Sequence, residues 1–143
     1  MIKNCTYRII PELNINVEYY SGIINVNDLV EVRQKLNCEK LLNDHFNFFV
    51  DLRDAVFDLQ TNVVEEFISY VKSDKNLLWK RKTAILSLTP NQTAFSILYM
   101  ADSGNLPMKI QAFSTMVSAL KWVNLSPYDQ PLIENVIEEI KKH

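Results

Sequence analysis

Charged side chains gather at the end of one short apolar segment. The segment 46–52 reads FNFFVDL, and Asp51, Arg53 and Asp54 lie where this predicted strand ends and a loop follows. Ligands of α/β proteins bind outside the carboxyl ends of parallel strands, so we expect these side chains to belong to a ligand or partner surface. Two carboxylates could do acid–base work if they stood about 5 to 10 Å apart in a pocket. The simpler interpretation is that Asp51 and Arg53 pair with each other or with the loop backbone.

Hydroxyl and amide side chains mark the starts of two predicted helices. In the segment TPNQ at 89–92, Thr89 and the glutamine three residues later form a capping box, with proline at the first helical position. Ser114 or Thr115 caps a later helix. Helix N-termini at this edge could present backbone N–H groups to a phosphate or a carboxylate, so Thr89, Asn91 and Thr115 join the predicted ligand or partner surface. Capping by itself also accounts for both threonines.

Signatures of metal, cofactor and catalytic sites are missing from the sequence. His45 and His143 have no second histidine, cysteine or carboxylate at metal-ligand spacing. Cys5 and Cys38 lack the C-x-x-C spacing, and no histidine and third group can be assigned to activate Cys38. The chain has two glycines and contains no P-loop, dinucleotide fingerprint or G-x-S-x-G motif. We therefore predict no metal, no cofactor and no catalytic residue.

The composition is typical of one globular domain that spans residues 1–143. Hydrophobic residues make up 48% of the chain, and the formal net charge is −2. Charges of both signs are spread along the chain, which predicts no nucleic-acid partner. The N-terminus lacks the apolar core of a signal peptide, and no stretch approaches about 18 uninterrupted apolar residues. We therefore expect a cytoplasmic protein with no membrane partner.

One stretch of the sequence is locally basic. It contains Trp79 and five cationic residues, Lys72, Lys75, Lys80, Arg81 and Lys82. Aromatic and basic groups together could contact a nucleic acid or an acidic protein surface. A solvated connection before the next strand is the more common explanation for such a run.

Periodicity predicts short strands that alternate with longer helices. Strand patterns occupy 7–10, 15–20, 46–52, 83–88 and 110–113, and helical patterns occupy 25–36, 61–73, 90–101 and two segments that begin near 115 and 129. The first two strands form a hairpin, and the alternation of polar and apolar residues in 15–20 predicts that one of its faces is exposed. The run 46–52 instead predicts a central strand covered on both faces.

This order of elements predicts an α/β fold with a single mixed sheet. The sheet has about five strands, with an antiparallel N-terminal hairpin and later parallel strands, and about five helices cover it. The last helix carries an apolar stripe, Leu132, Ile133, Val136, Ile137 and Ile140. We expect this helix to cover the protein's own core, with a homodimer as a further expectation. In the helix 90–101, Phe95 and Leu98 are expected to be buried.

Several segments together are similar to those of a known protein group. They are Ile15 to Gly22, Val50-Asp51-Leu52-Arg53, Thr89-Pro90-Asn91-Gln92, Phe113-Ser114-Thr115 and Ala119-Leu120-Lys121-Trp122. With these segments the chain resembles the STAS-like (SpoIIAA-like) small bacterial proteins. The resemblance implies a STAS-like fold and a regulatory, protein-binding role without catalytic chemistry.

The resemblance also implies where a regulatory serine would stand. Anti-sigma-factor antagonists of this group carry a phosphorylatable serine after an aspartate, between a central strand and the following helix. Here that place reads Asp51-Leu52-Arg53-Asp54, which contains no hydroxyl. Thr61 is the nearest hydroxyl and is better explained as a helix cap. The phosphoserine switch is therefore not expected in this chain.

Three functional hypotheses remain open at this point. The first is a non-enzymatic regulatory or protein-interaction module, whose partner is another protein. The second is a protein that binds a small anionic or apolar molecule between the sheet and its helices. The third is an enzyme that uses Asp51, Arg53 and Asp54, which requires a solvent-connected cleft around them.

Overall fold

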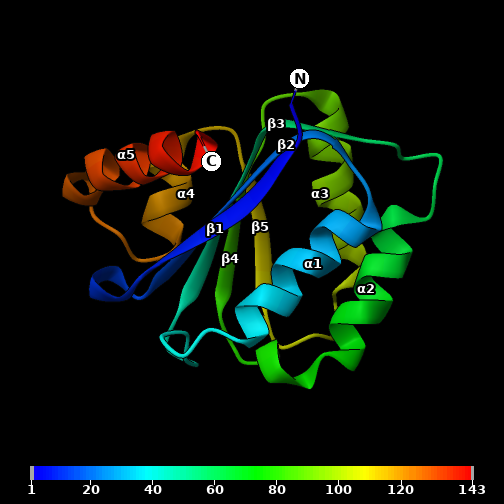
Figure 1. Cartoon of the computed structure of the whole chain (residues 1–143), viewed down its shortest axis with the longest axis horizontal. Helices are drawn as coiled ribbons and strands as arrows, with labels where there is room; N and C mark the ends of the chain where they lie inside the picture. The colour runs from blue at the N-terminus through cyan, green and yellow to red at the C-terminus, as the bar shows by residue number, and fades with distance from the viewer. Residues whose placement is uncertain (1, 143) are drawn as a thin grey trace.

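The five strands of the sheet lie in the order β1-β2-β3-β4-β5 (Figure 1). The computed structural model describes residues 2–142. The strands are β1 (Asn4–Ile10), β2 (Ile15–Ile24), β3 (Asn47–Phe57), β4 (Lys82–Leu86) and β5 (Lys109–Phe113). β1 is antiparallel to β2, and all other neighbouring strands are parallel. The predicted mixed sheet with its antiparallel N-terminal hairpin is confirmed.

Helices cover both faces of this sheet. They are α1 (Val26–Asn37), α2 (Val63–Ser73), α3 (Pro90–Asp102), α4 (Met116–Trp122) and α5 (Gln130–Lys141), with short 3₁₀ helices at Pro11–Leu13, Lys75–Leu77 and Pro127–Asp129. Figure 1 shows α1, α2 and α3 on one face and α4 and α5 on the other. Two apolar cores match these layers, one containing Leu29, Phe67 and Phe95 and the other containing Ala119 and Ile137. The cores form because each helix turns one apolar face to the sheet.

β3 is the middle strand, and its side chains alternate between the two cores. Phe48 and Leu52 pack under α1 to α3, whereas Phe49 packs under α4 and α5. All three side chains are at most 2% exposed. The prediction of a central strand covered on both faces is therefore confirmed.

β3 is longer than predicted, and this changes the setting of the predicted site residues. Asp51, Arg53 and Asp54 lie within the strand, which ends at Phe57, and not in a loop after it. The prediction was wrong because β2 also continues, so that parallel pairing between the two strands runs on to Ile24 and Phe57. A β-bulge in β3 near Arg53 interrupts the register, since one residue of β2, Tyr20, lies opposite two residues of β3, Leu52 and Arg53.

The far half of β3 extends past β4, and side chains of α3 complete its hydrogen bonds. Gln92 Nε2 donates to the carbonyl oxygens of Arg53 and Ala55, both at 3.0 Å. Asn91 Oδ1 accepts from the backbone N–H of Phe57, and its Nδ2 donates to the carbonyl of the same residue. Buried backbone groups need partners, so these bonds attach the start of α3 to the central strand.

β2 is buried on both faces, contrary to the prediction that one face is exposed. Asn16, Glu18 and Tyr20 are 0%, 6% and 2% exposed. The reason is tertiary: β2 lies between β1 and β3, and the layer of α1 to α3 covers it. The polar residues of this strand therefore form a buried polar row.

The predicted helix caps are largely confirmed. Thr89 and Gln92 form the capping box at the start of α3, with Pro90 at the first position. Of Ser114 and Thr115, it is Thr115 that caps α4, by accepting from a backbone N–H three residues later, and Asn25 caps α1. These local signals are reliable because a cap depends on residues adjacent in sequence.

Three smaller predictions were wrong. Thr61 does not cap α2, because its hydroxyl donates to the carbonyl of Asp58 and the helix begins two residues later. Leu98 and Leu132 are 46% and 45% exposed, since only one side of α3 and of α5 reaches the sheet. The other residues of the last apolar stripe are buried, so α5 covers the protein's own core as predicted.

A buried polar cavity as the candidate functional site

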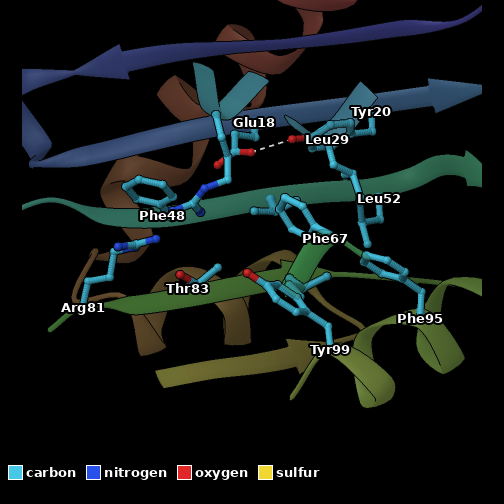
Figure 2. Close-up of a pocket in the computed structure, with 13 residues that line it drawn as sticks. Glu18, Tyr20, Leu29, Phe48, Leu52, Phe67, Arg81, Thr83, Phe95 and Tyr99 are labelled. Atoms are coloured by element: carbon cyan, nitrogen blue, oxygen red, sulfur yellow. Dashed lines mark hydrogen bonds between the residues drawn. The ribbon is translucent and has the colours of Figure 1, made fainter. Parts of the chain in front are cut away.

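A cavity of about 40 Å³ lies between the sheet and α1 to α3 (Figure 2). Its walls come from β2, β3, β4 and the three helices. The lining residues are Glu18, Tyr20, Leu29, Arg33, Phe48, Val50, Leu52, Phe67, Arg81, Thr83, Ile85, Phe95 and Tyr99. The cavity thus joins apolar walls to charged groups that are themselves buried, and such burial is uncommon for arginine and glutamate unless they are paired.

Glu18 is the buried carboxylate of this cavity. It lies on β2, where the alternation of the strand turns it toward α1 to α3. Tyr20 Oη donates to Glu18 Oε1 at 2.7 Å, and Asn16 Nδ2 donates to Glu18 Oε2 at 3.2 Å. Burial raises the pKa of Glu18, although the Tyr20 hydrogen bond and the charges of Arg33 and Arg81 act in the opposite direction.

Arg81 reaches the cavity from the residue before β4. Its Nη1 donates to the carbonyl of Leu77, and its guanidinium lies 4.1 Å from the Phe48 ring centroid and 5.0 Å from that of Trp79. Burial lowers the pKa of Arg81 to about 9, and the positive charge of Arg33 adds to the effect. Its Nε has no hydrogen-bond partner among the described residues.

Arg33 comes from the buried face of α1. It stands four residues after Leu29 and three before Leu36, so the periodicity of the helix directs it into the core. Its Nε lies 3.5 Å from Asp74 Oδ2, which makes an ion pair. Within the described part of the chain, Nε and Nη2 of Arg33 and Oδ2 of Asp74 are all without a hydrogen bond.

Two hydroxyl groups complete the polar lining. Thr83 projects from β4 and Tyr99 from α3, and Figure 2 shows the Tyr99 hydroxyl pointing toward Thr83. Burial raises the pKa of Tyr99, so this phenol is a neutral hydrogen-bond donor or acceptor at physiological pH. The cavity therefore holds two guanidinium groups, one carboxylate and hydroxyls that can orient a bound molecule.

The balance of donors and charges favours an anion. Both oxygens of Glu18 already accept hydrogen bonds, whereas three buried guanidinium N–H positions of Arg33 and Arg81 do not donate any within residues 2–142. A buried donor without a partner costs about 1 to 3 kcal/mol, and more if it is charged. Two guanidinium groups against one carboxylate also favour an anion in this cavity over a cation.

The sequence-predicted site residues lie outside this cavity. Asp51 is fully buried on the face of α4 and α5, and Arg53 binds it through two parallel bonds, Nε to Oδ1 at 3.0 Å and Nη2 to Oδ2 at 2.9 Å. The backbone N–H of Arg53 also donates to Asp51 Oδ1. This is the pairing given above as the simpler interpretation.

Asp54 is engaged beside that pair. Its Oδ2 accepts from the hydroxyl of Tyr19 at 2.5 Å and lies 3.7 Å from Lys141 Nζ on α5. Burial and the hydrogen bond to Asp54 raise the pKa of Tyr19. These contacts connect β2, β3 and the end of α5 at the carboxyl edge of the sheet.

The remaining predicted site residues act in local structure. Thr89 and Asn91 form the cap of α3 and its attachment to β3, as described above. Thr115 caps α4, and in the described chain it makes no hydrogen bond or ion pair with the other five predicted site residues. The structure therefore gathers Asp51, Arg53 and Asp54, places Asn91 at the far end of the same strand, and leaves Thr115 apart.

Sequence reasoning missed Glu18 and Arg33 as site residues. The polar row Asn16, Glu18 and Tyr20 was interpreted as an exposed face, and Arg33 was not considered. A signal for Arg33 was present, since it falls on the apolar stripe of α1 between Leu29 and Leu36. Arg81 was noted, but only as one member of a locally basic run.

The structure adds two findings on metals and membranes. Among residues 2–142, no group of three or more histidine, cysteine or acidic side chains is placed to hold a metal ion. His143, one of the two histidines considered above, lies outside the described residues. None of the described helices has the length and apolar character needed to cross a membrane.

Comparisons with known proteins bear on the fold. No protein-family model matches the chain, and no curated protein matches it. Among solved structures it is similar to an uncharacterized protein from the DUF3478 family with a SpoIIAA-like fold, from Shewanella loihica PV-4, with a TM-score of 0.58 and 13% sequence identity. The match covers 86% of this chain and 96% of that chain. The chain therefore has a SpoIIAA-like fold, as the resemblance seen in its sequence implied.

Proposed function

We propose that this chain is a non-enzymatic binding module whose ligand is a small anion held in the buried cavity. The observation that carries the proposal is that two buried arginines, Arg33 and Arg81, line one cavity whose lining contains a single carboxylate, that of Glu18. Buried donors are normally satisfied, and an anion satisfies both their hydrogen bonding and their charge.

The charges around the cavity support an anion over a cation or a neutral ligand. Two guanidinium groups line it against the single carboxylate of Glu18. Asp74 balances part of the charge of Arg33, but it is not among the lining residues. A cation placed here would meet two like charges in a medium of low dielectric constant.

The absence of a catalytic constellation supports binding over catalysis. None of the described residues that line the cavity is a histidine, cysteine or serine. Glu18, the one carboxylate, is held by Tyr20 and Asn16 and has no hydrogen bond to Thr83, the one aliphatic hydroxyl. A nucleophile needs a base within hydrogen-bond reach, and this pair does not provide one.

A thermal unfolding series tests the proposal. Purified protein is titrated with sodium acetate and with inorganic phosphate at constant ionic strength. Binding to the folded state alone stabilises it by about 2.7 kcal/mol at a hundred times Kd, which raises Tm by several degrees. We expect at least one of these anions to raise the Tm of the wild type.

Two variants connect that stabilisation to the cavity. Arg33→Gln should abolish the rise in Tm, because it removes one of the two positive charges that line the cavity. The matched control is Arg8→Gln, since Arg8 is exposed and pairs with Glu139 on the surface. An anion effect that is equal in both variants, or absent from the wild type, would count against the proposal.

A second candidate function is interaction with another protein, and a different observation favours it. A groove of about 360 Å³ lies at the amino ends of β4 and β5. Its described lining residues are Asn47, Lys80, Arg81, Lys82, Pro107, Lys109 and Asn124, of which four are cationic and none is acidic. Such a surface is complementary to an acidic segment of a partner protein.

Charge reversal tests this second candidate. A fluorescent glutamate-rich peptide should bind the wild type, and raising the salt concentration should weaken binding. The combined variant Lys80→Glu, Lys82→Glu and Lys109→Glu should lose binding. Reversal of Lys35, Lys72 and Lys75, which lie outside the groove, is the control. Equal affinity of the two triple variants for the peptide would refute the role of the groove.

A further inference from the structure

We infer that β5 is a dimerisation edge, at which it pairs in antiparallel orientation with β5 of a second copy of this chain. β5 is the last strand of the sheet, and β4 is its one neighbouring strand among the described residues. Three observations carry the inference: the direction of the free backbone groups of β5, the distribution of charge along the strand, and an exposed side of α3 beside it. None of them involves the buried cavity.

Two residues of β5 direct their backbone groups away from the sheet. On the β4 side, the N–H of Lys109 donates to the carbonyl of Arg81 at 2.8 Å, and the carbonyl of Phe113 accepts from the residue after β4 at 3.0 Å. Because backbone groups alternate in direction along a strand, those of Ile110 and Ala112 face the open edge. Such unpaired N–H and C=O groups form a template for another strand.

The free groups of β5 match those of a second β5. With Gln111 on a twofold axis, Ile110 of one copy lies opposite Ala112 of the other. Residues that lie opposite each other in this way exchange both of their N–H···O bonds in an antiparallel pair. The edge is therefore complementary to itself, as a twofold interface requires.

The charge of β5 also favours a second copy. Lys109 is the single charged residue of the strand, and in this register it lies opposite Phe113 of the second copy. An ammonium group is attracted to the face of an aromatic ring, whereas like charges placed opposite each other would destabilise the pairing. Gln111 meets its own copy on the axis, and its amide group can both donate and accept a hydrogen bond.

One side of α3 lies next to the open edge of the sheet. Thr93 Oγ1 is 3.4 Å from the hydroxyl oxygen of Ser87, whose N–H donates to the carbonyl of Phe113 at the end of β5. Ile97 and Ala101 follow Thr93 at intervals of four residues, so all three lie on this side of the helix. All three are exposed, and the exposed fraction of Ile97 is 53%.

This stripe of Thr93, Ile97 and Ala101 is suited to contact with its own copy. α3 carries no charged residue between Pro90 and Ala101. It is the last helix of its layer, with α2 on its other side. When two β5 strands pair, the two copies of α3 lie on the same face of the joined sheet, on either side of the axis. The stripes then face each other, and Ile97 is removed from water.

The opposite edge of the sheet is protected against such pairing. β1 lies between α1 and α5 (Figure 1). Ion pairs flank it, Lys3 with Asp28 of α1 and Arg8 with Glu139 of α5. Charged side chains at an edge strand oppose pairing with another chain. The two edges therefore differ, and β5 is the edge that a second copy fits.

Sedimentation equilibrium and hydrogen exchange of the full chain test the inference. Over about a hundredfold range of protein concentration, we expect the mass to rise from that of one chain to that of two. Hydrogen exchange at the amides of Ile110 and Ala112 should slow at least tenfold between dilute and concentrated protein. The amide of Gln111 faces β4, so its protection should not depend on concentration.

Two variants locate the dimer on this edge. Ala112→Pro removes an outward N–H and keeps the bonds to β4, so it should weaken dimerisation at least tenfold without changing the circular dichroism spectrum. Ile97→Asp should weaken it as strongly, because two carboxylates would face each other across the axis.

Leu98→Asp is the matched control for Ile97→Asp. Leu98 is 46% exposed on the same helix. It stands seven residues after Asn91, which bonds to β3, so it lies on the side of α3 away from β5. Dimerisation should be unchanged in this variant. If Ala112→Pro does not fold, the comparison of Ile97→Asp with Leu98→Asp decides the outcome.

The outcomes that would overturn the inference are distinct. One is a wild type that stays monomeric over the whole concentration range, which includes the case of a β5 that pairs only with a strand of another protein. Another is a dimer of undiminished affinity in folded Ile97→Asp, since the contact would then lie elsewhere. Exchange rates of Ile110 and Ala112 that do not change with concentration would overturn it as well.

Discussion

At the scale of the residue, three buried charged side chains have a large effect on the stability of this protein. Glu18, Arg33 and Arg81 lie inside the layer of α1 to α3, at 6%, 4% and 7% exposure. Removing one partner from such a group costs far more than removing a surface charge, because the remaining charge stays buried. The clearest measurable consequence is the dependence of stability on pH.

Glu18→Gln should reduce the loss of stability as the pH rises. Burial raises the pKa of Glu18 above its ordinary value of 4.5, so the folded state holds this proton more tightly than the unfolded state. The contribution of the group to the free energy of unfolding is therefore largest below pH 4.5 and falls as the pH rises through the raised pKa. The slope is at most about 1.4 kcal/mol per pH unit for one proton.

Urea denaturation between pH 4 and pH 8 measures this effect. The difference in unfolding free energy between Glu18→Gln and the wild type should grow in favour of the variant as the pH rises. Glu12→Gln is the matched control, since Glu12 is an exposed carboxylate. Parallel pH profiles for Glu18→Gln and the wild type would show that Glu18 does not carry this linkage.

At the scale of the element, β2 and β3 are the two strands that continue beyond their neighbours. Beyond the bulge in β3 near Arg53 the two strands remain paired as far as Ile24 and Phe57. Gly22 lies in this extended part with a φ of +89°, a conformation that other residues rarely adopt. A Cβ added to Gly22 would stand 3.0 Å from the Cα of Lys3.

Gly22→Ala should therefore destabilise the protein by about 1 to 3 kcal/mol, through backbone strain and the contact with the chain at Lys3. Gly104→Ala is the matched control, because a Cβ there would meet Ala101 O at 3.7 Å, an ordinary contact, and its φ is not positive. The measurement is the urea midpoint of both variants. Equal midpoints would contradict the strain argument.

At the scale of the whole molecule, two helical layers share one sheet. Phe48 belongs to the core under α1 to α3 and the adjacent Phe49 to the core under α4 and α5. Each layer also holds one tryptophan: Trp79 packs edge-on against Phe48 at 6.0 Å, and Trp122 packs against Phe113 at 5.7 Å. Unfolding of either layer would expose β3, so the layers should unfold together.

Two single-tryptophan variants test this cooperativity. Trp122→Phe leaves Trp79 to report on one layer, and Trp79→Phe leaves Trp122 to report on the other. In each variant the fluorescence transition should coincide with the loss of helical circular dichroism in urea. Separate fluorescence and circular dichroism transitions in either variant would show that the layers unfold independently.

The sequence by itself determined the kinds of element and their order. Capping residues and periodicity depend on neighbours along the chain, so the capping box at Thr89, the cap at Thr115 and the central strand around Phe49 could be predicted. The mixed topology followed from the order of strands and helices and from the handedness of crossover connections. For the same reason, the SpoIIAA-like fold could be predicted from the sequence.

Only the tertiary structure decided which polar residues are buried and which of them meet. Glu18 alternates with apolar residues as an exposed strand residue would, and its burial depends on α1 to α3, which are distant in sequence. Arg33 and Arg81 are 48 positions apart, and they line one cavity because α1 and β4 pack on the same side of the sheet. Burial and convergence are properties of packing between elements, and no local pattern encodes them.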